Sequence, residues 1–154
     1  MSANNAMYAN AQDFILRIGE KQAIELTDRE QPFQHVVNET VLNQALADCS
    51  SEIDGYLAGR YRLPLKQVPL NLVRLCCDLA RYRLCSMSEV TITDDVRERY
   101  ENAIAELKLL AKGTTSLGID QPPEDDDEGD TVVMFSNGNT RVFSRDHKNR
   151  TSLD

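Results

Sequence analysis

The chain has 154 residues, of which 41% are hydrophobic and 27% charged, a composition typical of one folded domain with appended segments. Its formal net charge of -8 repels phosphate and disfavours tight, sequence-independent binding to nucleic acid. No apolar run approaches the roughly 20 residues that a membrane-spanning helix needs, and the first residues lack the pattern of a signal peptide. We therefore expect a cytoplasmic protein without a membrane segment.

Two short helices are predicted first, over about residues 11–18 and 20–26. Asn10 can accept a hydrogen bond at the start of the first helix, and Gly19 is placed to end it. Residues 27–38 contain a proline and lack a helical repeat, so they are predicted to form a loop.

A third helix is predicted over about residues 39–58, because its apolar residues recur at alternating spacings of four and three. These residues share one face of the helix and are Leu42, Leu46, Cys49, Ile53 and Tyr56. Residues 60–69 hold two prolines, each of which disfavours helix in the preceding residue. This segment is therefore predicted to be an extended connector.

A fourth helix is expected over about residues 69–86, with an apolar side and an arginine-bearing polar side. The apolar side consists of Val73, Cys76 or Cys77, Ala80 and Leu84, and the polar side of Arg74, Arg81 and Arg83. A fifth helix is predicted over residues 94–112, with Thr93 as its N-cap and Gly113 as its stop. Its repeating apolar residues are Val96, Tyr100, Ala103, Leu107 and Leu110.

The sequence changes character after the fifth helix. Residues 119–130 are rich in carboxylates and cannot bury enough apolar area to order themselves, so they are interpreted as an acidic linker. Beyond it, two short β-prone runs flank Asn137 and Gly138, a strong signal for a hairpin turn. An isolated hairpin is marginally stable in water, so we expect the arm of residues 131–154 to dock on a partner.

No residue pattern indicates catalysis, a metal site or a cofactor. No cysteine or histidine pair has the two-residue gap of zinc sites, and the four cysteines are interpreted as reduced core residues. His35 falls in a predicted loop and His147 near the C-terminus, where an imidazole is seldom held as a catalytic base. We therefore expect that the protein is not an enzyme.

Charged residues leave two questions open. Seven arginines either mark a nucleic-acid face or pair with carboxylates, within the subunit or across a subunit boundary, and the acidic balance favours pairing. They are Arg60, Arg62, Arg74, Arg81, Arg83, Arg97 and Arg99. The acidic run of residues 124–130 is either a solvated spacer or a group that contacts or repels something specific, such as DNA in a channel.

Seven segments, spread from the second helix to the C-terminal arm, carry a family resemblance. They are LTDR at 26–29, SEIDGYLAGRYRLPL at 51–65, VP at 68–69, CDLARYRL at 77–84, RYENAI at 99–104, AKGTTSLG at 111–118 and RVFSRD at 141–146. Together they resemble the phage Mu-like small structural protein family, over nearly the whole chain from Met7 onward. The resemblance implies a protein similar to the helical adaptors beneath the portal of tailed phages. Such adaptors form a ring, usually twelvefold, between the portal and the next neck or tail component.

The expected fold is mainly α: a bundle of about five helices over residues 1–118, the acidic linker, and the C-terminal β-hairpin arm. The expected function is that of a head–tail connector subunit of the virion neck, assembled in the host cytoplasm. Its homo-oligomeric ring would let DNA pass without sequence-specific binding, while the arm contacts the portal or a neighbouring subunit. The expected contact residues are Val133, Phe135, Arg141, Val142, Phe143 and Arg145. The alternative is a phage-encoded helical DNA-binding regulatory protein.

Overall fold

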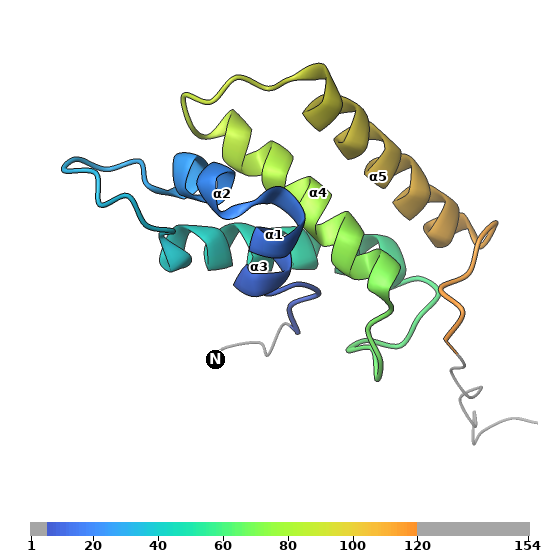
Figure 1. The fold of residues 1–154 in the computed structure, drawn as a ribbon. Helices are drawn as coiled ribbons and strands as arrows, with labels where there is room; N and C mark the ends of the chain where they lie inside the picture. The colour runs from blue at the N-terminus through green and yellow to red at the C-terminus, as the bar shows by residue number, and fades with distance from the viewer. Residues whose placement is uncertain (1–5, 120–154) are drawn as a thin grey trace, which may run out of the picture. The chain divides into compact units, whose positions relative to one another are not determined.

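The computed structural model describes residues 6–119, which contain five α-helices (Figure 1). Two short helices, α1 (Ala11–Ile18) and α2 (Glu20–Thr27), precede three long ones, α3 (Glu39–Leu57), α4 (Leu70–Ser86) and α5 (Asp94–Lys112). The prediction of a mainly helical body is confirmed. The predicted hairpin arm, and all but the first residue of the predicted linker, lie outside the described residues.

Short polar side chains cap α1 and α5 at the positions predicted from the sequence. The Asn10 carboxamide oxygen accepts a hydrogen bond from the Asp13 amide at 2.9 Å, and the Asp13 carboxylate accepts one from the Asn10 amide at 3.0 Å. This reciprocal capping box satisfies two amides that the helix itself leaves unpaired. The Thr93 hydroxyl oxygen caps α5 by accepting a hydrogen bond from the Val96 amide at 3.3 Å, and Gly113 ends α5 at a φ of 78°, a left-handed conformation that favours glycine.

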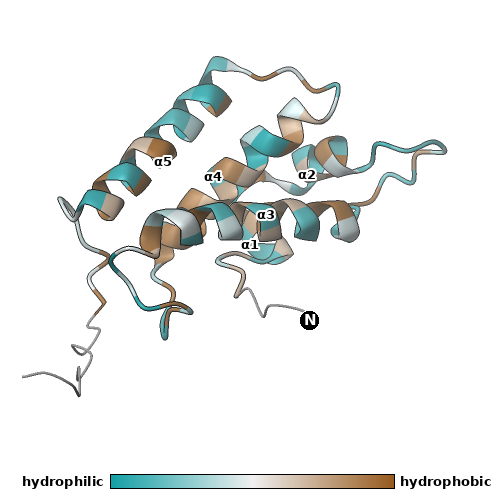
Figure 2. Ribbon diagram, turned by 180° about the vertical axis from the view of Figure 1, so that it is seen from behind, coloured by the Kyte–Doolittle hydropathy of each residue, from teal (hydrophilic) through white to brown (hydrophobic). Residues whose placement is uncertain are grey.

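The helices assemble around α3 and α4, each of which contacts all four of the others. Consecutive long helices run in roughly opposite directions, and α1 and α2 pack on the α3–α4 pair (Figure 1). Hydrophilic residues lie along the outward side of α5 (Figure 2), whereas Ala103, Leu107 and Leu110 of this helix are buried. None of the helices in residues 6–119 has the length and apolarity needed to cross a bilayer.

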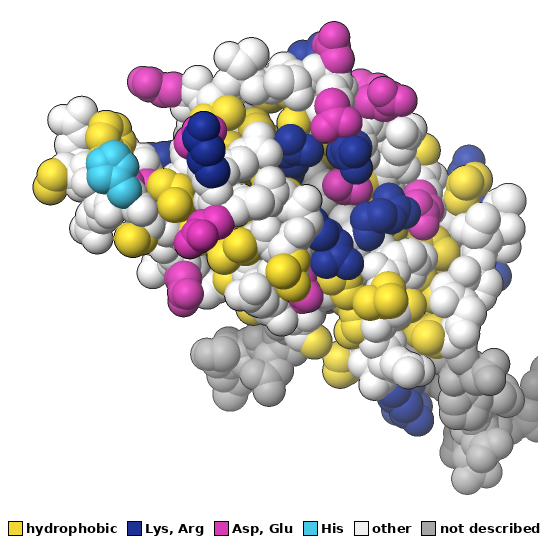
Figure 3. Space-filling view, viewed as in Figure 1, with side chains coloured by type: hydrophobic (Ala, Val, Ile, Leu, Met, Phe, Trp, Pro, Cys, Tyr) yellow, Lys and Arg dark blue, Asp and Glu magenta, His cyan; other side chains and the backbone are white. Residues whose placement is uncertain are grey.

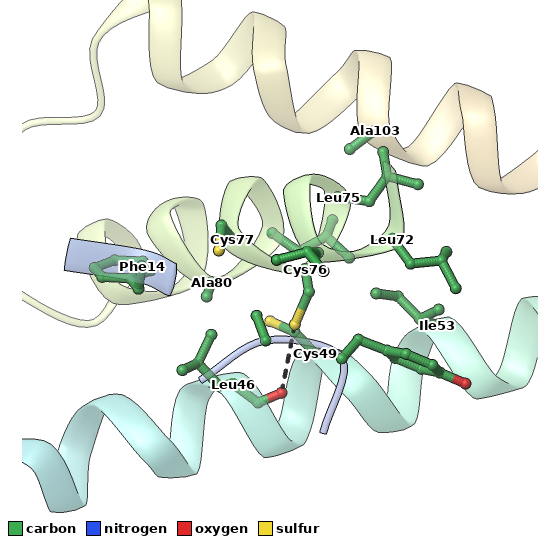
Figure 4. Packing of buried hydrophobic residues seen from close by; sticks show 14 of the residues in the cluster. Phe14, Leu46, Cys49, Ile53, Leu72, Leu75, Cys76, Cys77, Ala80 and Ala103 are labelled. Atoms are coloured by element: carbon green, nitrogen blue, oxygen red, sulfur yellow. Dashed lines mark hydrogen bonds between the residues drawn. The ribbon is translucent and has the colours of Figure 1, made fainter. Parts of the chain in front are cut away.

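Helix α4 is buried around most of its circumference. Nine of its 17 residues are buried, including both Cys76 and Cys77, so the prediction of a single apolar side was too narrow. Figure 4 shows the reason: Cys76 lies against Cys49 of α3, while Leu75 lies toward Ala103 of α5. A helix with neighbours on several sides buries residues that a two-sided pattern assigns to the surface.

The central position of α4 can be tested by one substitution made at two places in this helix. Leu75 is fully buried and Leu70 is 79% exposed. Leu75→Ala should lower the free energy of unfolding by about 2–5 kcal/mol, because it removes buried methyl groups and leaves a cavity. Leu70→Ala should change it by less than about 0.5 kcal/mol. Urea denaturation followed by circular dichroism measures both, and equal effects would contradict the described core.

Candidate interaction surfaces

The residues predicted to contact a partner all belong to the C-terminal arm. Val133, Phe135, Arg141, Val142, Phe143 and Arg145 lie outside the described residues, so their docking stays a prediction. Besides single exposed apolar residues such as Leu16 and Leu70, the described body has two features that bring several apolar side chains together, and neither was predicted from the sequence. One is the α2–α3 loop, residues 28–38, and the other is a groove between α3 and α4.

The α2–α3 loop is held at its base by side-chain hydrogen bonds. The Asp28 carboxylate accepts hydrogen bonds from the amides of Gln34 at 2.9 Å and His35 at 2.8 Å. The buried Thr27 hydroxyl oxygen accepts another from the Asn38 amide at 2.9 Å, just before α3 begins. Because one carboxylate bridges residues six and seven positions away, the loop has a defined conformation rather than an open one.

The tip of this loop presents apolar side chains to solvent. Phe33 is 51% exposed and Val36 is 55% exposed, and the loop projects away from the helices (Figure 1). Hydrophobic side chains gather on the projecting loop in Figure 3. His35, between them, has a φ of 57°, which is uncommon for a residue other than glycine. An apolar tip on a loop held in one conformation loses little entropy when it binds a partner.

A groove of about 260 Å³ lies between the first half of α3 and the end of α4, and we call it the α3–α4 groove. Its lining is mainly apolar and includes Val41, Ala45, Leu84 and Met87, with Thr40, Gln44, Asp48, Arg29 and Arg83 also present. Met87 is 61% exposed, and its backbone oxygen accepts a hydrogen bond from Arg29 at 2.9 Å. The sequence pattern could not reveal this groove, because its lining comes from three separate segments.

Four of the seven arginines pair with carboxylates inside the subunit, which confirms the pairing interpretation for these four. Most of the pairs join different helices. They are Arg74 with Glu106 at 2.6 Å and with Asp78 at 3.5 Å, Arg81 with Asp95 at 3.3 Å, Arg83 with Glu52 at 3.0 Å, and Arg99 with Asp95 at 2.9 Å. Hydrogen bonding from Arg99 lowers the pKa of Asp95, whereas burial raises the pKa of Asp78 despite the nearby Arg74.

The four cysteines are free and buried in the core. Burial raises the pKa of the Cys49, Cys76 and Cys77 thiols to about 12. The Cys76 thiol donates a hydrogen bond to the backbone oxygen of Leu46 at 3.7 Å, drawn as a dashed line in Figure 4. Among residues 6–119, no three His, Cys, Asp or Glu side chains are grouped in a way that could hold a metal ion.

Comparison with known proteins assigns this small helical protein to a phage family. Residues 8–136 match the family described as Bacteriophage Mu, Gp36. The chain is 37% identical over 132 residues to the Mu-like prophage FluMu protein gp36 of Haemophilus influenzae, covering 86% of this chain and 90% of that protein. It is 32% identical over 141 residues to gene product J of Escherichia phage Mu, covering 92% and 96%. The chain belongs to the bacteriophage Mu Gp36 family, and the resemblance to Mu-like phage proteins is confirmed.

The buried thiols should be almost inert in the folded protein. A thiol with a pKa of about 12 is only about 0.01% thiolate near pH 8, against roughly a quarter for an ordinary cysteine. A thiol-specific disulfide reagent should therefore label the native protein slowly and label all four cysteines rapidly in denaturant. Met87→Cys, which adds an exposed thiol, should react once at the ordinary rate. Rapid labelling of the unmodified native protein would contradict the described burial.

The hydrogen bonds of Asp28 should determine the conformation of the α2–α3 loop. Asp28→Ala removes both bonds to a charged acceptor, each worth about 1.5–3 kcal/mol, so exchange of the Gln34 and His35 amides should accelerate about tenfold or more. Glu30→Ala, an exposed neighbour in the same loop, should leave these rates unchanged. Hydrogen–deuterium exchange resolved by NMR measures both variants, and equal exchange rates would show that Asp28 does not hold the loop.

Proposed function

We propose that this protein is a head–tail connector subunit of a tailed-phage neck, forming a ring between the portal and the next neck or tail component. Membership of the bacteriophage Mu Gp36 family supports a role in a phage particle. The main support for a ring is that one small body has two different exposed apolar surfaces, the α2–α3 loop and the α3–α4 groove. A cyclic ring needs two unlike, complementary surfaces on each subunit, because each subunit contacts its two neighbours through different surfaces.

The C-terminal arm joins this ring to its partner in our proposal. Residues 131–143 add strands to a sheet of the portal or a neighbouring subunit, with Phe135 and Phe143 in pockets and Arg141 and Arg145 beside acidic groups. The family match reaches residue 136, past the acidic segment, and the alignment with gene product J covers 92% of the chain. These matches support an arm that is part of the chain the family shares.

DNA passes through the lumen of the proposed ring without being held. The net charge is -8, and Arg74, Arg81, Arg83 and Arg99 are already engaged by carboxylates of their own subunit. Phosphate therefore meets a surface of net negative charge, on which these four arginines already face carboxylates. This charge balance supports a structural ring rather than a DNA-binding regulator. By analogy with phage adaptors, the proposed ring has twelve copies of the subunit. It is assembled in the host cytoplasm and lies in the virion neck.

Deletion of the residues after Ile119 tests the role of the arm. Leu117 is buried, its amide donates to the Tyr61 hydroxyl at 3.0 Å, and Ile119 packs against the core, so the truncation keeps the last contacts of the body. The truncated protein should show unchanged helical circular dichroism and fail to join heads to tails in an assembly assay.

Point variants in the full-length chain show whether a defect comes from losing specific contacts of the arm or from shortening the chain. Phe135→Ala with Phe143→Ala should reproduce the joining defect, because the two rings are the largest apolar groups proposed to fill partner pockets. Asn149→Ala, a control in the same arm, should join heads to tails normally. Full activity of the truncated protein would refute docking by the arm.

A further inference from the structure

We propose that the tip of the α2–α3 loop of one subunit inserts into the α3–α4 groove of a second copy of this chain. This inference rests on the ring proposed above and names its subunit–subunit contact. The inserted residues are Phe33 and Val36, and the receiving residues are Val41, Ala45 and Met87. The contact joins unlike surfaces, so each subunit can give its loop to one neighbour and receive the loop of the other.

The size and chemistry of the groove suit the loop tip. A cavity of about 150 Å³ is enough to hold benzene, and the α3–α4 groove measures about 260 Å³, enough for a phenyl ring together with part of a valine. Met87, at its edge, is unbranched and adapts to an inserted ring better than a stiff side chain would. The positively charged Arg29, which also lines the groove, can meet the exposed Glu30 of the incoming loop.

The occupant comes from another molecule because the loop is tied away from its own groove. Arg29 lies in the loop and also lines the groove, where it donates a hydrogen bond to the backbone of Met87. The two bonds to Asp28 hold the tip in its projecting conformation. Folding the tip back would break these bonds, and in the described conformation Phe33 and Val36 are about half exposed.

This contact is small, and its weakness suits ordered assembly. Insertion of two side chains buries far less than the roughly 800 Å² per partner of a standard stable interface. An isolated pair of subunits therefore associates weakly. On a portal template, each added subunit gains the loop–groove contact and the portal contact together, which raises the effective concentration and favours a closed ring.

Disulfide cross-linking of the full-length protein tests this contact directly. A variant carrying both Phe33→Cys and Met87→Cys is concentrated, oxidised with glutathione disulfide and separated by non-reducing electrophoresis. The native cysteines are buried and do not compete. We expect a ladder of dimers, trimers and larger species, because each subunit donates one thiol and receives another. Either single variant should stop at dimers in low yield.

A matched double variant, Leu16→Cys with Met87→Cys, serves as the control. Leu16 is 73% exposed on α1 and belongs to neither the α2–α3 loop nor the α3–α4 groove. A ladder no stronger than that of this control would overturn the proposal. Abundant dimers from a single variant would also overturn it, since they indicate a symmetric contact. A fast-migrating monomer from the double variant would show that the loop enters its own groove.

The cross-linking result is independent of the arm. It uses purified protein without portal or tails, whereas the truncation after Ile119 is scored by joining of heads to tails. If no ladder forms and the truncated protein fails to join heads to tails, the loop–groove contact is refuted, while the connector function is still supported. If a clear ladder forms and the truncated protein joins heads to tails normally, the loop–groove contact is supported and the proposed role of the arm is refuted.

Discussion

The burial of α4 is the constraint on which the other features of the body depend. This helix and α3 each contact all the other helices, and Leu72, Leu75 and Leu79 of α4 are essentially inaccessible to solvent. Close packing around them determines where α3 and α5 lie, because a well-packed core tolerates few alternative arrangements. Leu84 near the end of α4 and Met87, the residue just after this helix, then line the α3–α4 groove. The exposed surface proposed to receive a neighbour is thus built from the end of the most buried helix.

The arginines of α4 show how a nearly surrounded helix carries charge. Arg74, Arg81 and Arg83 reach carboxylates on α5 and α3, so the pairs lie where helices meet at the surface. Exposed or partly exposed pairs contribute little to stability, and their main consequence here is electrostatic. In these pairs, the carboxylates neutralise arginine charges that would otherwise attract phosphate. A subunit with an acidic total charge and engaged arginines is consistent with the proposed channel, through which DNA would move without adhering.

A body of this size leaves apolar groups that its own core cannot cover, since small domains bury a smaller share of their surface. Phe33 and Val36 are held in solvent by a hydrogen-bonded loop, whereas a flexible loop could have turned them inward. The same logic applies to the hairpin predicted for the arm, because a hairpin of this size is too small to be stable alone. Both features suit a protein whose remaining stability comes from neighbours in an assembly. The four thiols are buried inside the body and are not exposed for such contacts.

The sequence by itself determined the helices and their limits. Asn10, Thr93 and Gly113 act on backbone groups within a few residues, and apolar spacing defines one face of a helix, so both signals are local. The predicted arm and its contact residues remain predictions, because they lie outside the described residues. Only the tertiary structure decided the second buried side of α4, the partners of the arginines, the exposure of Phe33 and the α3–α4 groove. Each depends on which faces of distant segments meet, and spacing along one segment carries no information about its neighbour.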